Sequence, residues 1–347
     1  MDTLGGAEFA PTTTYLNTSN CALLPRRSVE AVKQLAEQLA AGTGGSGSFE
    51  ATDAVRASFG RISGVGAERV ALGGSVAVHV GLIASSLPAG AEVVAPEGEF
   101  SSVVTPFAAR GDLKVRYAPL ERIAEAIEPG TALVALSAVQ SSDGRVADLA
   151  AVRDAARAHG ARVLLDASQA AGWLPLDAGE YDYTVTAAFK YLLSPRGVSF
   201  LTVTEEAQRS LTPLHAGWLA GEDLSRGSYG PVEEFARSAR RFDEPTSFLS
   251  YHAAEHSLAL VERLGVERIH AHDTALAARF RGGLAVLGYE PVPGDSAIVA
   301  VPGLGGREPE LARAGIVVSA RAGNMRASFH LYNSEADVDR ALDVLSG

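Results

Sequence analysis

Cysteine is the scarcest residue type in this sequence, and its scarcity excludes several kinds of site. The 347 residues include one cysteine. An internal disulfide needs two cysteines, and a zinc-thiolate or iron-sulfur cluster needs more, so none of these can form within the chain. Such sparing use of cysteine fits a reducing cytoplasm.

Excess positive charge and long apolar runs are also lacking. The chain has 30 Lys and Arg against 41 Asp and Glu, a net charge of -11. A surface of this sign repels phosphate-rich partners, so we expect neither a nucleic acid nor a membrane as partner. No apolar run approaches the ~20 residues of a spanning helix, and residues 1–17 lack the basic and apolar regions of a signal peptide. We therefore expect a soluble, cytoplasmic protein.

Short β-branched apolar runs alternate with alanine-rich helical segments between residues 68 and 199. We expect strands at residues 70–72, 92–95, 114–117, 132–138, 162–166, 183–187 and 198–203, and helices that include residues 75–86 and 148–159. The second helix has Asp148 as its N-cap and Gly160 as its stop. This alternation predicts an α/β fold with a mostly parallel mixed sheet.

The pattern changes near residue 246. Two long helices are expected at residues 250–264 and 266–287, followed by a strand, a helix and a strand through residue 328 and a closing helix from Ser334. This order indicates a smaller α+β domain at the C-terminus. We expect an N-terminal arm at residues 1–25, a large domain at 26–245 and a small domain at 246–347.

Two short motifs match known sites only in form. Residues 42–47, GTGGSG, fit the dinucleotide pattern G-x-G-x-x-G, but a predicted helix at residues 28–41 precedes them instead of a strand, so a flexible loop is favoured. His252, Glu255 and His256 match the H-x-x-E-H pattern of inverted zincins. No other metal signal accompanies them, so we favour two solvated helix histidines and expect no metal site.

The strongest chemical signal is an acid and a lysine at the ends of neighbouring strands. Asp166, in RVLLDASQAAGWLPLD, ends a buried strand where ligands of open α/β sheets bind, and Lys190, in YDYTVTAAFKYLLSPRGVSFLTV, follows the next strand. Alone, Asp166 could cap a turn and Lys190 could be a surface lysine. Together these segments resemble fold-type I pyridoxal phosphate (PLP) enzymes of the aminotransferase class V superfamily, such as cysteine desulfurases and kynureninases. The resemblance runs nearly end to end and implies PLP as cofactor.

The resemblance assigns four residues to the cofactor ring. Lys190 would form a Schiff base with its aldehyde and later act as general base or acid at Cα. Asp166 would pair with the pyridine nitrogen and keep it protonated, so that the ring can accept electrons. Gln169 would hydrogen-bond the phenolic oxygen, and Phe100, in EGEF, would stack on the ring.

The resemblance places the phosphate at the turn formed by Gly73, Gly74 and Ser75, with Val76 as the next residue of the site. This turn enters a helix, where free N-H groups and the helix dipole favour an anion. The segment RFDEPTSF resembles the one through which a neighbouring subunit delivers a threonine, here Thr246, to that phosphate. A homodimer with shared active sites is therefore expected.

Substrate contacts are implied at both ends of the chain. Arg326, in MRASFHLYN, would bind the substrate α-carboxylate in bidentate fashion. Arg321 could assist it or brace its own strand. Residues 15–25 match the N-terminal arm that closes over the site, and Asn20 and Cys21 are the substrate candidates within it.

The sequence departs from the desulfurase pattern at several positions. Those enzymes carry a cysteine on a loop ahead of the arginine signature, where residues 319–325 here read SARAGNM. Cys21 lies far from that loop, so persulfide transfer by the usual route is not expected. Ala187 and Phe189 replace a phosphate-binding hydroxyl and a histidine, and Ser141 aligns with an asparagine near the cofactor oxygen.

These features are most similar to the branch that includes the C-S lyase of ergothioneine biosynthesis and tailoring enzymes of sulfur antibiotics. A β-elimination needs deprotonation at Cα and departure of a β-thiolate or sulfenate, but no enzyme thiol. The leading prediction is therefore a PLP-dependent C-S lyase acting on a cysteine-conjugate-like amino acid. The alternatives are a class V aminotransferase or decarboxylating deaminase, and, with less support, a non-catalytic scaffold or a zinc hydrolase.

Overall fold

A large mixed sheet forms the centre of the fold. The computed structural model describes residues 3–44, 49–225 and 228–347. Within these ranges the sheet strands are β2 (Val70–Gly73), β3 (Glu92–Pro96), β4 (Lys114–Ala118), β5 (Thr131–Ser137), β6 (Arg162–Asp166), β7 (Tyr183–Ala187) and β8 (Ser199–Val203). Their order is β2-β8-β7-β6-β5-β3-β4. Strand β8 is antiparallel to both neighbours and the other pairs are parallel, which confirms the predicted mostly parallel mixed sheet.

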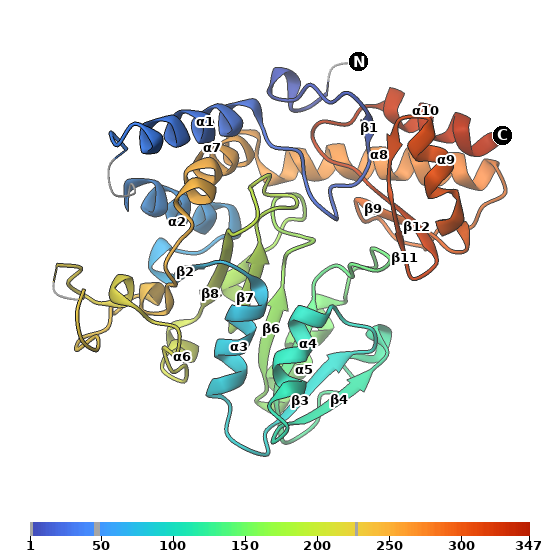
Figure 1. Ribbon diagram of the computed structural model, residues 1–347. Helices are drawn as coiled ribbons and strands as arrows, with labels where there is room; N and C mark the ends of the chain where they lie inside the picture. The colour runs from blue at the N-terminus through green and yellow to red at the C-terminus, as the bar shows by residue number, and fades with distance from the viewer. Residues whose placement is uncertain (1–2, 45–48, 226–227) are drawn as a thin grey trace.

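Helices cover both faces of this sheet because its strands are apolar on both sides. Alternate residues of a strand point to opposite faces, and in β5 Val134 lies in one core while Leu133 and Ala135 lie in the other. The first core includes residues of α2 (Phe49–Ser63), α5 (Leu149–His159) and α7 (Phe248–Leu264), and the second includes residues of α3 (Val76–Ser86) and α4 (Ser101–Ala109) (Figure 1). Burial on both faces explains the continuous apolar runs in the sequence.

The C-terminal part of the chain builds a second sheet with its own core. Its elements are α8 (Val266–Val286), β9 (Ile298–Val301), α9 (Glu308–Arg313), β10 (Ile316–Val317), β11 (Ser319–Arg321), β12 (Asn324–Ser328) and α10 (Glu335–Ser346). Strand β12 pairs antiparallel with β11 and β9, and residues of α8 and α10 close a third apolar core with this sheet.

The N-terminal segment connects these two parts. Strand β1 (Thr14–Tyr15) pairs in parallel with β10 in a separate two-stranded sheet. An isolated bridge between Asn17 and Ser328, at the end of β12, places this segment against the C-terminal sheet (Figure 1). The chain then returns through α1 (Arg26–Ala40), which contacts α7, as α2 also does. Helix α7 therefore belongs to the larger core by its contacts, and the domain division predicted at residues 245 and 246 stays a prediction.

Local sequence signals set the element ends. The side chain of Asp148 accepts a hydrogen bond from the N-H of Ala151 (3.0 Å), and Gly160 ends α5 with a φ of 68°. Helix α1 begins at Arg26, earlier than predicted, because Pro25 serves as its N-cap. The strand ends of the large sheet differ from the predicted ones by at most one residue.

The GTGGSG segment follows helix α1 and not a strand, which removes the context that dinucleotide binding requires. Its residues 45–47 lie outside the described ranges. Among the helices that the structure describes, none combines the length and apolar character needed to cross a membrane.

Candidate active site

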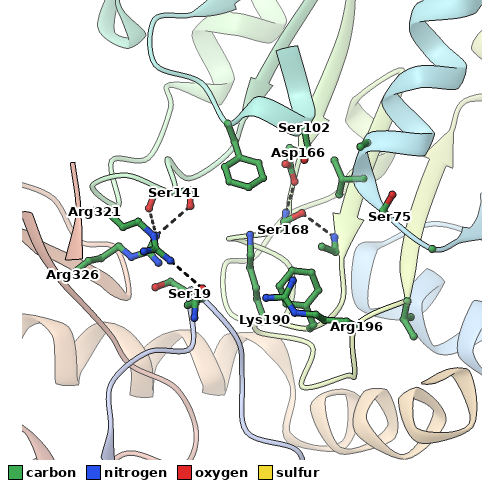
Figure 2. A pocket seen from close by; sticks show the side chains of 18 residues that line it. Ser19, Ser75, Ser102, Ser141, Asp166, Ser168, Lys190, Arg196, Arg321 and Arg326 are labelled. Atoms are coloured by element: carbon green, nitrogen blue, oxygen red, sulfur yellow. Dashed lines mark hydrogen bonds between the residues drawn. The ribbon is translucent and has the colours of Figure 1, made fainter. Parts of the chain in front are cut away.

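A cavity of about 320 Å³ lies at the carboxyl ends of the central strands (Figure 2). Strand β6 ends in it at Asp166, the turn after β7 brings Lys190, and the start of α3 closes one side. The N-terminal segment and the C-terminal sheet close another side. Eight of the predicted site residues line it: Asn20, Gly74, Ser75, Val76, Phe100, Asp166, Lys190 and Arg326.

Lys190 is buried, and its amine faces two aromatic rings. The Nζ atom lies 5.5 Å from the centroid of the Phe100 ring and 5.8 Å from that of Phe189. Burial lowers the pKa of Lys190 to about 8; the charge of Asp166 opposes this shift, and those of Arg326 and Arg196 add to it. An amine with this pKa is half deprotonated near pH 8, as a nucleophile or general base requires.

The turn that carries Lys190 is held by buried hydrogen bonds. The N-H of Leu193 donates to the carbonyl oxygen of Lys190 (3.0 Å). His330 contacts the carbonyl oxygen of Tyr191 through Nε2 (3.0 Å) and a carboxylate oxygen of Asp273 through Nδ1 (2.8 Å). Because a carbonyl oxygen only accepts, Nε2 carries the hydrogen of this contact. The C-terminal part of the chain therefore fixes the backbone next to the reactive lysine.

Asp166 provides a buried carboxylate in the same cavity. Its Oδ1 accepts a hydrogen bond from the N-H of Ser168 (2.8 Å). Burial raises the pKa of Asp166, and the positive charge of Lys190 opposes this. A protonated ring nitrogen placed against the carboxylate would favour its charged form in the same way. The residue thus fits the partner of a pyridinium ring.

The turn before α3 fits a phosphate group. Ser75 is the N-cap of α3, yet its side chain makes no capping hydrogen bond. Its hydroxyl and the first N-H groups of the helix can therefore serve a bound anion. The N-H of Gly74 already donates to an oxyanion, the carboxylate of Glu244, at 2.7 Å.

Two arginines make the opposite end of the cavity positive. Arg326 on β12 is 1% exposed, and its Nη1 donates to the carbonyl oxygen of Ser141 and to its hydroxyl (3.2 Å). Burial lowers the pKa of Arg326 to about 10, and the charge of Arg321 adds to this shift. Nη2 of Arg321 donates to Oδ1 of Asn20 (3.1 Å). With a pKa of about 10, Arg326 stays charged at neutral pH, and its guanidinium group suits a carboxylate.

Gly73 of the predicted phosphate turn and three predicted side chains do not line the cavity. Nε2 of Gln169 donates to the carbonyl oxygen of Ser19 (2.9 Å), and its buried Oε1 has no hydrogen-bond partner among the residues that the structure describes. Sγ of Cys21 contacts the carbonyl oxygen of Ala22 at 3.7 Å. Thr246 is half-buried, and the role predicted for it concerns a neighbouring subunit. The roles of all three stay predictions.

The cavity lining also includes Arg196, for which the sequence predicts no role. It follows Lys190 in the SPRG segment, and its guanidinium carbon lies 4.3 Å from the centroid of the Phe189 ring. Spacing along a turn does not show that such a side chain lies over the ring of Phe189. The other lining residues without a predicted role are Ser19, Ala77, Ser102, Ser168 and Val198.

The histidines of the HAAEH motif lie outside this cavity, on α7. The rings of His252 and His256 pack edge to face with centroids 5.8 Å apart. Within the described ranges, no group of three or more His, Cys, Asp or Glu side chains is arranged to hold a metal ion. The geometry thus offers no support for the zinc alternative.

Comparisons with known proteins agree with this geometry. The family described as aminotransferase class-V matches residues 74–341. The uncharacterized aminotransferase YcbU of Bacillus subtilis (strain 168) is 29% identical over 325 residues, which cover 88% of this chain and 86% of that protein. Isopenicillin N epimerase of Streptomyces clavuligerus is 26% identical over 393 residues, with 97% and 96% covered.

A solved structure shares the whole fold. The complex of the cystine C-S lyase C-DES with cysteine persulfide superposes with a TM-score of 0.88 at 23% identity, covering 96% of this chain and 97% of that one. This likeness confirms the predicted fold-type I architecture. Another C-DES structure contains glycine covalently linked to its PLP cofactor.

The range matched by the family contains Gly74, Asp166 and Lys190, which line the cavity described above. The phosphate turn, the buried carboxylate and the amine of low pKa fit one PLP molecule. The chain belongs to the aminotransferase class V family, and its cofactor is pyridoxal 5'-phosphate.

Proposed function

We propose that this chain is a PLP-dependent lyase that cleaves the C-S bond of a cysteine-conjugate-like amino acid by β-elimination. The observation that carries the proposal is a cavity in which Lys190, Asp166 and Arg326 meet without a thiol among its described lining residues. The one cysteine, Cys21, lies outside the lining. These groups suit a reaction that releases a thiolate, whereas a persulfide transfer would need a cysteine at the substrate.

Each residue has one task in this scheme. Bound PLP supplies an aldehyde that holds the substrate amino group and a ring that accepts electrons. Asp166 keeps the proton on the ring nitrogen, and Phe100 covers one ring face. Arg326 binds the substrate α-carboxylate through its guanidinium N-H groups. Substrate Cα is thereby oriented toward Nζ of Lys190.

Lys190 moves the proton. Its neutral amine takes the proton from Cα, the electrons of that C-H bond form the Cα-Cβ double bond, and the C-S electron pair leaves with sulfur. The lysine ammonium can return the proton to the departing thiolate. Lys190, neutral again, would then displace the product amino group from the cofactor aldehyde, and the freed three-carbon enamine hydrolyses in water to pyruvate and ammonia. No enzyme thiol takes part in any of these steps.

The relatives support both the leading function and its runner-up. C-DES is named a cystine C-S lyase, which agrees with the elimination. YcbU is named an aminotransferase, which favours transamination as the second candidate. A decarboxylating deamination is a third outcome of the same cofactor chemistry. Lys190 and Asp166 in one cavity argue against a non-catalytic scaffold.

The same proposal includes a homodimer with shared active sites. Phe248 and Leu249, close to Thr246, are exposed apolar residues at the start of α7. An apolar groove beside them is lined by Leu24, Val29, Val32, Lys33, Pro195, Leu249 and Ser250. Covering this surface with a second copy would place Thr246 at the interface, as its predicted contact with the phosphate of a neighbouring subunit requires. Light scattering of the holoenzyme, with Leu249→Glu as the disrupting variant, tests this arrangement.

The decisive experiment is a product assay on the holoenzyme. Incubation with S-substituted cysteines is expected to release pyruvate and ammonia in equal amounts while the cofactor stays PLP. Alanine, which has no leaving group at Cβ, is the matched control substrate. The variant Lys190→Ala is expected to abolish release, while Lys114→Ala, at an exposed strand position, is expected to retain it.

Other products would redirect the assignment. Conversion of PLP to pyridoxamine phosphate together with a 2-oxo acid would establish the aminotransferase. Release of carbon dioxide would establish the decarboxylating deaminase. Full activity of Lys190→Ala would refute the mechanism as a whole.

A further inference from the structure

Arg196 is an exposed arginine at the cavity, stacked on Phe189 but without an ion pair in the described part of the chain. It lines the cavity, and no ion pair or hydrogen bond engages its guanidinium group among these residues. Arg326 and Arg321 both donate to neighbours across the cavity. Arg196 is exposed, so its N-H donors are free to reach a ligand that enters the cavity.

The Phe189 ring holds this arginine beside the reactive lysine. The guanidinium carbon of Arg196 and Nζ of Lys190 lie 4.3 Å and 5.8 Å from the centroid of that ring. Planar guanidinium groups stack on aromatic faces and keep their N-H edges free. Figure 2 shows Arg196 on the side of Lys190 that faces away from Arg321 and Arg326.

Apart from Arg196, the described lining residues at the phosphate turn offer N-H and hydroxyl donors but no positive charge to a dianion. Gly74, Ser75 and Val76 are neutral, and Ala187 and Val198 add apolar surface. The nearest charge at the turn is negative, since the carboxylate of Glu244 accepts from the N-H of Gly74 at 2.7 Å. A phosphate dianion placed there would be repelled by this carboxylate unless a cation offset it.

We propose that Arg196 binds the phosphate group of the cofactor and supplies the cation that this end of the site lacks. The inference rests on PLP being the cofactor. A guanidinium group matches two phosphate oxygens with parallel N-H donors, and stacking on Phe189 limits the entropy lost on binding. Arg326 and Arg321 are left for the substrate, because they lie on the other side of Lys190.

The test compares two ligands that differ only in the phosphate. PLP and pyridoxal are titrated separately into cofactor-free full-length protein, and the dissociation constant of each is read from absorbance. For Arg196→Met, which keeps an unbranched side chain on Phe189, PLP affinity is expected to fall about ten- to a hundredfold, the range for a charge-assisted hydrogen bond. Pyridoxal affinity is expected to stay unchanged. Arg196→Lys keeps the charge but loses the fork of donors, so its PLP affinity is expected to lie between those of the wild-type protein and Arg196→Met.

Arg157→Met, at an exposed position of α5, is the matched control and should leave both affinities at wild-type values. Equal loss of PLP and pyridoxal in Arg196→Met would overturn the proposal, because the effect would then not involve the phosphate. Unchanged PLP affinity with a raised KM for the amino acid would overturn it in favour of a substrate contact. Unchanged PLP affinity with loss of the dimer would overturn it in favour of an interface contact.

If Arg196→Met fails to fold, Arg196→Lys decides: an unchanged PLP/pyridoxal affinity ratio overturns the proposal. Failure of the wild-type protein to bind either ligand would refute the cofactor assignment itself, a result distinct from the others.

Discussion

The low pKa of Lys190 can be measured directly through its reaction with a small aldehyde. The sequence has three lysines, at positions 33, 114 and 190, and the first two are exposed. A pKa of about 8 in place of the ordinary 10.5 makes the neutral amine about 300-fold more abundant at neutral pH. The aldehyde reacts only with the neutral amine, so the rate at Lys190 reports this fraction.

The assay is a short pulse of formaldehyde and cyanoborohydride on cofactor-free protein over a range of pH. Mass spectrometry of peptides then gives the methylation rate of each lysine, with Lys33 and Lys114 as references in the same digest. We expect the rate at Lys190 to reach half of its maximum near pH 8. In Asp166→Asn the midpoint should move lower, because the charge of Asp166 raises the pKa of Lys190 in the wild-type protein.

Two results would refute this reasoning. A profile for Lys190 that overlays those of the two exposed lysines would show that burial does not control its pKa. A midpoint that rises in Asp166→Asn would show that the acid does not act on the lysine through its charge.

Three further predictions concern the surroundings of the cofactor site. Asp243→Asn should lower the free energy of unfolding by about 3 to 5 kcal/mol in urea titrations, because it removes the buried carboxylate 2.6 Å from buried Arg56 and leaves only the exposed Asp53, 4.0 Å away, as counter-charge; an unchanged midpoint would contradict this. Arg326→Lys should raise the substrate KM about tenfold or more by removing the bidentate contact, and an unaltered KM would place the carboxylate elsewhere. Glu244→Gln should tighten PLP binding about two- to fivefold, since a competing anion leaves the N-H of Gly74; weaker binding in the absorbance titration would contradict this.

Much of the large sheet could be predicted because its signal is local. Strands β5 and β6 are apolar on both faces, so each reads as a continuous hydrophobic run whatever its neighbours are. Asp148 and Gly160 mark the ends of α5 within one short segment. The positions of Asp166 and Lys190 followed from the same strands, since parallel strands end at a common edge.

The contacts that tune the site depend on segments far apart in the sequence. His330 contacts Asp273 and the backbone of the lysine turn, although 57 positions separate the two residues in the sequence. The sequence around neither residue predicts this contact. Arg196 lies over Phe189 only because the turn reverses the chain. The partner of the Gln169 amide, the Ser19 carbonyl, comes from the N-terminal segment. The periodicity and spacing of residues along the sequence do not predict such long-range contacts.

The most direct test of the whole account is to find where the cofactor is attached. The holoenzyme is reduced with borohydride, digested and analysed by mass spectrometry, with Lys190→Ala as control. The account predicts a phosphopyridoxyl group on Lys190 and none on Lys33 or Lys114. Stoichiometric label on either of those lysines, or the same label in Lys190→Ala, would contradict it.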